Sequence, residues 1–315
     1  MGEDGGAPSL TQLAIPIFIL LVTIEIILFA RGRIGVHGKP LRYETKDTAA
    51  SLAMGFGNTI FSGAVFLLVI GGVSALEPYT LFDLGWTWWV LILCFFIEDM
   101  TFYWSHRMSH EIRWFWASHV IHHSSQHYNL STALRQNWTD LATGAWLFYI
   151  PIIMIGFPVE MILMFRGASS VYQFWIHTES VPKLGFLEKF MNTASHHRVH
   201  HATNPEYLDR NHAGVLIIWD KIFGTFVEER DGVPIRYGIV KNIGTFNPVK
   251  IAFHEWVSLF RDAWNAPGLK AKLGYIFGPP GWSHDGSRQT SEQIRSTWRT
   301  RQQIADGAQA AAAAE

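Results

Sequence analysis

The most informative stretch of the chain is residues 106–123, which reads His106-Arg-Met-Ser-His110-Glu-Ile-Arg-Trp-Phe-Trp-Ala-Ser-His119-Val-Ile-His122-His123. A related pattern, His197-Arg-Val-His200-His201, follows later in the chain, with a single His177 between them. Residues three and four apart stand on the same face of an α-helix, so each group should direct two or three imidazoles toward one point. The pattern predicts helices arranged around a histidine cluster.

Such a cluster is typical of a metal site. Imidazole nitrogen suits iron, zinc, copper or nickel, and eight or nine nitrogens exceed the coordination of any single first-row ion. Packing that many imidazoles together without a metal would also be electrostatically costly. We therefore expect two metal ions. The chain has one cysteine, Cys94, in an apolar run, which excludes a cysteine-based zinc or iron–sulfur site.

The composition around these motifs indicates a membrane protein. Of 315 residues, 49% are hydrophobic and only 16% are charged, with a formal net charge of −1. Because there is no basic surface, nucleic acid is excluded as a partner. Apolar runs of about 20 residues cross a bilayer, so we expect an all-α integral membrane protein with four or five membrane helices. The predicted spans are residues 13–30, 48–76, 86–104, 141–157 and 159–177.

The expected topology places every histidine group on the cytoplasmic side. Basic residues are concentrated in the short loop between the first two spans, and such loops remain in the cytoplasm. Residues 141–177 could span or re-enter the membrane, with a break at Gly156-Phe157-Pro158. The remaining segments are predicted to be an N-terminal segment (residues 1–12), a cytoplasmic helical cap (178–284) and a mobile C-terminal tail (285–315), all outside the spans.

The position of the histidines favours redox chemistry over hydrolysis. Hydrolytic zinc sites usually keep three protein ligands and an open position for water, which is fewer than this chain supplies. A site at the inner ends of apolar helices can receive a lipid sideways from the bilayer, where the hard step is breaking an unactivated C–H bond. That chemistry calls for a redox metal and O2, which makes iron the favoured metal.

The motifs resemble the fatty acid hydroxylase/sterol desaturase superfamily of membrane di-iron enzymes. Within it, the chain is most similar to alkylglycerol monooxygenase and its bacterial relatives, over about residues 45–283. Besides the His197 motif, the similarity rests on these stretches: His122-His123-Ser124-Ser125, Tyr128-Asn-Leu-Ser-Thr-Ala-Leu-Arg-Gln136, Gln173-Phe-Trp-Ile-His-Thr-Glu179 and Gly214-Val-Leu-Ile-Ile-Trp-Asp-Lys-Ile-Phe-Gly-Thr-Phe226. Relatives often carry an acidic residue in place of Gln126 and an aromatic residue in place of His212.

The resemblance implies a specific set of site residues. Asp99 and Glu111 match acidic positions around the first histidine motif and are the predicted catalytic residues. Asp99 either accepts a hydrogen bond from a ligand imidazole or is a capping or interfacial carboxylate. Asn211 and Asp220 are candidates for the same supporting role, and Gln173 could reach the metals or satisfy His177. The implied metal shell is His106, His110, His119, His122, His123, His177, His197, His200 and His201.

The resemblance also implies a function. We expect a di-iron monooxygenase that hydroxylates a lipid C–H bond with O2 and cleaves an ether lipid, with electrons from tetrahydrobiopterin or a redox protein. The nearest alternative is a sterol or fatty-acyl desaturase or hydroxylase of the same superfamily. From other classes, a membrane metal transporter and a di-zinc lipid hydrolase remain open. A bacterial inner membrane is favoured over an endoplasmic reticulum as the host.

Overall fold

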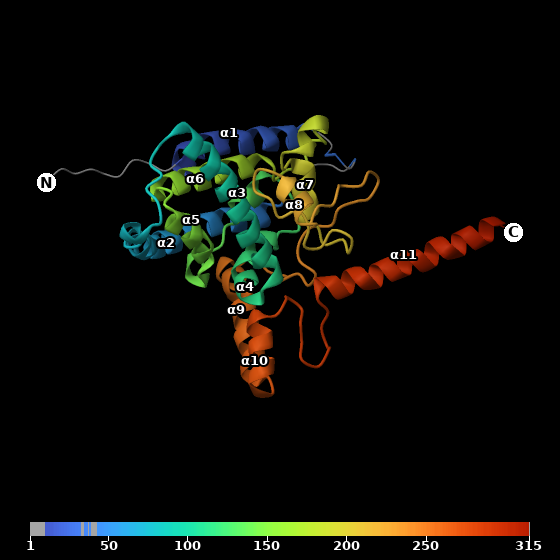
Figure 1. The fold of residues 1–315 in the computed structure, drawn as a ribbon. Coiled ribbons are helices and arrows are strands. Elements are labelled where there is room, and N and C mark those ends of the chain that lie inside the picture. Colours follow the sequence, from blue (N-terminus) through green and yellow to red (C-terminus); the bar gives the residue numbers. More distant parts are fainter. Residues whose placement is uncertain (1–9, 33–34, 37, 39–42, 315) are drawn as a thin grey trace.

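The protein is helical throughout the part described by its structure, a computed structural model that covers residues 10–32, 35–36, 38 and 43–314. Within that part there is no strand, only two isolated β-bridges, Met191 with Leu216 and Ala202 with Tyr237. The longer helices are shown in Figure 1. Their bounds are α1 (Leu10–Ala30), α2 (Thr45–Ser74), α3 (Trp88–Glu111), α4 (Arg113–His123), α5 (Ile150–Ile155), α6 (Val159–Trp175), α7 (Ala194–His200), α8 (Ile218–Ile222), α9 (Pro248–Asn265), α10 (Gly268–Phe277) and α11 (Ser291–Ala314). Short 3-10 turns connect them at Glu77–Tyr79, Leu130–Leu134, Leu141–Thr143, Ala145–Tyr149 and Gly185–Lys189.

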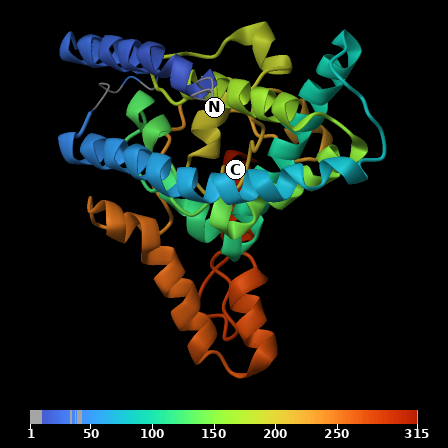
Figure 2. The same cartoon turned by 90° about the vertical axis from the view of Figure 1, so that its left-hand side faces the viewer.

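The apolar core lies between α3, α5 and α6. Val90 and Cys94 of α3 are fully buried and pack in one cluster with Ile152 of α5 and with Met161 and Ile162 of α6. A second cluster joins α1 to α6, where the rings of Phe18 and Phe174 stack at 4.0 Å. Helices α1 and α2 run along roughly parallel lines on the same side of the body (Figure 2). These contacts hold α3, whose last turns carry His106 and His110, against α6, which ends just before His177.

The chain reverses at Gly156-Phe157-Pro158, where the sequence predicts a break. Gly156 ends α5 with a left-handed backbone (φ 116°), and Pro158 is the residue before the first turn of α6. A Cβ on Gly156 would lie 1.9 Å from the carbonyl oxygen of Phe82, so only glycine fits this turn. The reversal therefore places the start of α6 directly beside α5.

Among the residues that the structure describes, one helix is long and apolar enough to cross a membrane by length and composition. It is α1 over Leu13–Ala30, and 11% of that window is buried within the protein. A second span is counted if Thr45–Gly63 and Leu68–Tyr79, bent by 45°, form one element. The predicted spans at residues 86–104, 141–157 and 159–177 fall on α3, on the segment ending in α5, and on α6. None of these three meets the same criterion, so the predicted number of spans and the cytoplasmic cap remain predictions.

The C-terminal segment contains a helix that was not expected. Residues 285–315 were predicted as a mobile tail, but α11 covers Ser291–Ala314 and extends away from the body (Figure 1). A capping box begins it, since the backbone N–H of Thr290 donates to Oε1 of Gln293 (2.8 Å) and Gln293 N–H donates back to Thr290 Oγ1 (3.4 Å). Alanine, glutamine and arginine then favour the helix locally. A helix can form here without a core because local propensity alone supports it.

A buried ion pair joins Arg198, on helix α7, to Glu229, in the chain after α8. Arg198 is 1% exposed and forms a bidentate pair with Glu229, at 2.9 and 2.7 Å. Its Nη1 also donates to the backbone carbonyls of Thr178 and Val181. Arg198 lies between His197 and His200, so this pair fixes the helix that carries both ligands to the chain near His177.

We predict that Glu229→Gln lowers the free energy of unfolding by about 3–5 kcal/mol, because it leaves the buried guanidinium without a counter-charge. The adjacent Glu228→Gln is the matched control. Glu228 is exposed and pairs only with Lys183 at the surface, so its loss should cost less than about 1 kcal/mol. Thermal unfolding of the two purified variants measures the difference, and equal melting temperatures would contradict the assignment.

Candidate metal centre

The structure brings all nine predicted histidines together. Within each of two neighbouring groups, one ring nitrogen from every residue lies within 4.8 Å of the others. The two groups touch, because the rings of His122 and His123, and likewise those of His200 and His201, lie 5.5 and 5.2 Å apart across the boundary. The first group is His106, His110, His119, His123 and His200, and the second is His122, His177, His197 and His201.

The three-plus-one motifs do not each converge on one point, which corrects the expectation from spacing. His119 and His123 belong to the first group while His122 belongs to the second, and His197 and His201 belong to the second while His200 belongs to the first. Adjacent residues on an α-helix point about 100° apart, whereas residues four apart differ by about 40°. Each motif therefore gives an i, i+4 pair to one group and the remaining imidazole to the other.

The outer nitrogens of the rings are held by oxygen atoms of the protein. In the first group, the Nδ1 atoms of His106 and His200 lie 2.8 and 3.0 Å from the carbonyl oxygens of His212 and Arg210. In the second group, the Nδ1 atoms of His122 and His177 lie 3.2 and 2.7 Å from the carbonyls of Arg135 and Gln173. A carbonyl oxygen only accepts, so each Nδ1 donates and each Nε2 keeps its lone pair.

These lone pairs point at one another. The Nε2 atoms of His122 and His177 are 3.1 Å apart, and Nε2 of His197 lies 2.9 Å from that of His177. Nε2 of His110 and of His200 has no protein partner although both are buried. Burial lowers the pKa of His122 to about 4, and burial with repulsion from neighbouring imidazoles lowers the pKa of His119, His197 and His201 far below the usual value. Because protonation is disfavoured, metal cations are the natural partners for these nitrogens.

Two residues near the first group were not among the predicted site residues. Asp209 Oδ1 lies 3.2 Å from Nδ1 of His110 and can orient that ring, but the sequence offers no distinguishing signal for it. His212 is fully buried, and its ring centroid lies 5.0 Å from that of His110 and 5.9 Å from that of His106. Neither of its ring nitrogens has a protein partner. The sequence did offer a signal for His212, because relatives often carry an aromatic residue at this position.

The two predicted acidic residues do not contact an imidazole. Asp99 accepts hydrogen bonds from the backbone N–H groups of Val215 and Leu216 at 2.9 and 3.0 Å and from Nε1 of Trp219 at 2.9 Å. Glu111 is exposed and pairs with Arg107 at 2.7 Å. Neither carboxylate is placed beside a ring by these contacts, and the catalytic role predicted for the two residues stays a prediction. Asp99 faces α8 rather than the rings because the loop before α8 presents unpaired N–H groups to it.

The other supporting residues act through the backbone. Asp220 accepts from the N–H groups of His212 and Ala213 at 2.7 and 2.8 Å, which fixes the carbonyl that His106 uses. Asn211 has a left-handed backbone (φ 57°), and its amide joins the chain at 196 to the chain at 227. Gln173 satisfies His177 through its main-chain carbonyl, while its side chain donates to Ser169.

A cavity of about 570 Å³ adjoins the histidines. Five of the nine imidazoles line it, and the rest of its wall comes from α1, α2, α3, α5, α6 and the segment between α4 and α5. Apolar residues of α2, α5 and α6 form one part of this wall, including Val69, Ile70, Ile153 and Ile162. Arg166 and Asp140 are its charged lining residues. A cavity of this size with an apolar wall can hold an elongated apolar molecule beside the rings.

Comparison with known proteins identifies the class. Residues 91–225 match the family model described as fatty acid hydroxylase. That range contains most of α3, all of α4 and α7, and all nine histidines. Residues 91–225 are therefore similar to the fatty acid hydroxylase family, which confirms the resemblance predicted from the motifs. No solved structure was found to match the chain.

The chain is, more particularly, similar to the alkylglycerol monooxygenases. It is 41% identical to the human enzyme over 279 residues and 39% identical to that of Danio rerio over 284 residues, which is 87% and 88% of this chain. It spans about 60% of the length of these relatives. An ornithine lipid hydroxylase of Rhizobium tropici is 26% identical over 136 residues, covering 43% of this chain and 41% of that protein.

We predict that His197→Ala removes one of two bound metal ions. His197 Nε2 lies 2.9 Å from Nε2 of His177 and 3.2 Å from that of His201, at the centre of the group with four members. His254→Gln is the control, since that ring belongs to neither group. Elemental analysis of the purified proteins should give about half the wild-type metal content for the first variant and the full content for the second. Full metal in His197→Ala would contradict the second site.

We predict that the metal-free protein loses stability as the pH falls from 7.5 to 5. The lowered pKa values keep these imidazoles neutral in the folded state, whereas unfolded histidines take up protons below about pH 6.5. Each such imidazole then costs up to about 1.4 kcal/mol per pH unit below that value. Thermal unfolding after chelation, measured across this range, tests the prediction. A melting temperature that does not change with pH would contradict it.

Proposed function

We propose that the nine histidines hold two iron ions and that the chain carries the active site of a lipid monooxygenase that cleaves an ether lipid with O2. The observation that carries this proposal is the convergence of unprotonated Nε2 atoms in two touching groups beside a partly apolar cavity. The similarity to alkylglycerol monooxygenases supports the ether lipid. Asp99 and Glu111 have no catalytic part in this proposal.

The donor set fits two redox metals. Nine imidazoles supply more ligands than a hydrolytic zinc site uses, and nitrogen ligands suit iron. When bound, the two irons would supply the reduction of O2 and the insertion of one oxygen atom into a C–H bond. The chain itself orients the rings through carbonyl oxygens, excludes water by burial and binds the lipid in the cavity.

The reaction on an ether lipid balances as follows. The CH2 group beside the ether oxygen gains a hydroxyl group, which consumes O2, two electrons and two protons and releases one water. The resulting hemiacetal breaks its C–O bond and gives an aldehyde and an alcohol. The ether oxygen stabilises charge or radical character on its neighbouring carbon, so that carbon reacts preferentially. The electrons come from tetrahydrobiopterin or from a redox protein.

A second candidate is hydroxylation of an acyl chain without cleavage. It is supported by the match of residues 91–225, which hold the histidines, to the fatty acid hydroxylase model. An ornithine lipid hydroxylase is also similar, over 136 residues. In both candidates the protein lies in a membrane through α1 and neighbouring helices, and the histidines face the cytoplasm. The cytoplasmic face and a bacterial inner membrane remain predictions from the sequence.

The deciding experiment is anaerobic purification, iron quantitation and turnover of isotope-labelled lipids with and without O2. We expect about two irons per chain and an O2-dependent labelled aldehyde from a 1-O-alkylglycerol, with tetrahydrobiopterin or a ferredoxin system as reductant. Hydroxylated acyl lipid with no aldehyde would favour the second candidate.

Two results would reject the proposal. Tightly bound zinc with O2-independent product release would indicate a lipid hydrolase. Absence of any product from ether, acyl and sterol lipids, at full iron content and with every reductant, would remove the oxygenase assignment. His197→Ala serves as the inactive control and His254→Gln as the active one.

A further inference from the structure

Helices α9 and α10 form a hairpin that extends from the body of the protein. Figures 1 and 2 show it pointing downward, whereas α1 and α2 lie horizontally in both views. The hairpin is joined to the body at its first turns, where Ile251 and Ala252 are buried against Ala50 and Met54 of α2. If α1 and α2 cross a bilayer along their axes, the hairpin lies close to the plane of that bilayer.

The hairpin is amphipathic. One face of each helix is buried, on α9 through Leu259 and Ala263 and on α10 through Ala271 and Tyr275. The other faces carry large apolar side chains at intervals of three, four or eight residues. These side chains are strongly exposed: Trp264 is 82% and Leu269 71% accessible to solvent. The full exposed stripe is Val249, Val257, Phe260, Trp264, Leu269, Leu273 and Phe277. Such a stripe in water is unfavourable unless something covers it.

The charges of the hairpin are sorted between its two faces. Its two acidic residues, Glu255 and Asp262, both pair with Arg113 of α4, at 2.7 and 2.8 Å. Asp262 also pairs with Arg288 at 2.6 Å. The acidic groups are thus neutralised on the inner side of the hairpin.

The basic residues border the stripe. Lys250, Arg261 and Lys270 each follow a stripe residue directly, which places them about 100° around the helix from it. Lys272 Nζ lies 5.9 Å from the ring of Trp264 and donates to the Trp264 carbonyl at 3.4 Å, so the border of α10 adjoins the end of the stripe on α9. The outer face combines aromatic and aliphatic groups with a cationic rim.

We propose that the α9–α10 hairpin lies in the headgroup region of an anionic lipid surface, with its apolar stripe immersed and its lysines at the phosphates. Aromatic and leucine side chains facing a bilayer between basic residues are the composition of interfacial helices. The stripe also continues an apolar surface, since α2 exposes Leu52, Phe56 and Ile60 next to the residues that hold α9. A second copy of the chain would not explain the basic rim.

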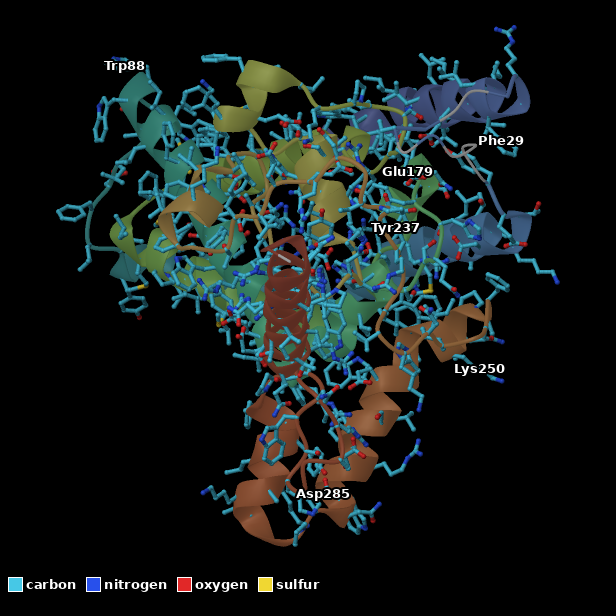
Figure 3. All side chains as sticks on the ribbon, turned by 90° about the vertical axis from the view of Figure 1, so that its right-hand side faces the viewer. Phe29, Trp88, Glu179, Tyr237, Lys250 and Asp285 are labelled. Atoms are coloured by element: carbon cyan, nitrogen blue, oxygen red, sulfur yellow. The ribbon has the colours of Figure 1, made fainter. Side chains whose placement is uncertain are left out.

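A spin label tests the proposal on the whole chain. Cys94 is the only cysteine and is buried, so the unsubstituted protein serves as the labelling blank. Nitroxides at Phe260→Cys and Leu273→Cys report on the stripe, and Asp285→Cys, an exposed position in the turn after α10, is the control (Figure 3). The readout is collision with apolar O2 relative to collision with a water-soluble nickel chelate, in nanodiscs that each hold one copy.

We expect the ratio of O2 to nickel collisions at Phe260→Cys and Leu273→Cys to exceed that at Asp285→Cys by at least threefold in discs with anionic lipid. Nickel access equal to the control at both stripe positions would overturn the proposal. Protection that appears only in discs with two copies would assign the stripe to a second chain instead.

A charge reversal tests the rim separately. Lys250→Glu combined with Lys270→Glu should reduce the ratio at Leu273→Cys at least twofold in anionic discs and leave it unchanged in zwitterionic discs. An equal change in both lipids would overturn the preference for anionic lipid. Neither lysine lies near the histidines, so retained metal content and helical circular dichroism verify that each variant is folded.

Discussion

The Nε2 atoms of His122 and His177 face each other at 3.1 Å while each ring already donates its only proton from Nδ1 to a backbone carbonyl. Two lone pairs at that distance repel each other. The low pKa of His122 shows that placing a proton between them is energetically unfavourable. The rest of the structure serves to hold such an arrangement in place. A metal cation placed between the two nitrogens would be attracted to both lone pairs. Nine imidazoles offer enough ligand nitrogens for two such cations.

The supporting network reaches the rings through the main chain. Asp220 fixes the N–H groups of His212 and Ala213, and Asp99 fixes those of Val215 and Leu216. Together they hold the segment whose carbonyl orients His106. Gly214 lies within it, where a Cβ would come 2.6 Å from the Phe102 ring. Asp99 and Asp220 therefore stabilise the backbone around His106 without contacting an imidazole themselves.

The sequence predicted the identity of the cluster well because ligand type and spacing are local properties. Helical periodicity put His106 with His110 and His119 with His123, and the break at Gly156 follows from its left-handed backbone. The division of neighbouring residues between two groups depends on how α4 and α7 face each other across the site, which no local pattern contains. The contacts of Asp99 and Asp209 depend on segments far away in the chain. Helix α11 was missed because its sequence has no pattern of buried apolar residues.

The cavity touches only part of the cluster, and this asymmetry bears on how a substrate reaches it. His106, His119, His122, His177 and His197 line the cavity, whereas His110, His123, His200 and His201 do not. Two members of this second set, His110 and His200, are oriented by Asp209 and by the carbonyl of Arg210, in the loop between α7 and α8. The cavity therefore reaches the imidazoles from the side formed by α1, α2, α3 and α6, whereas the four rings of the second set are buried. An apolar molecule held in this cavity would contact these five imidazoles directly, which is what the proposed lipid oxidation requires.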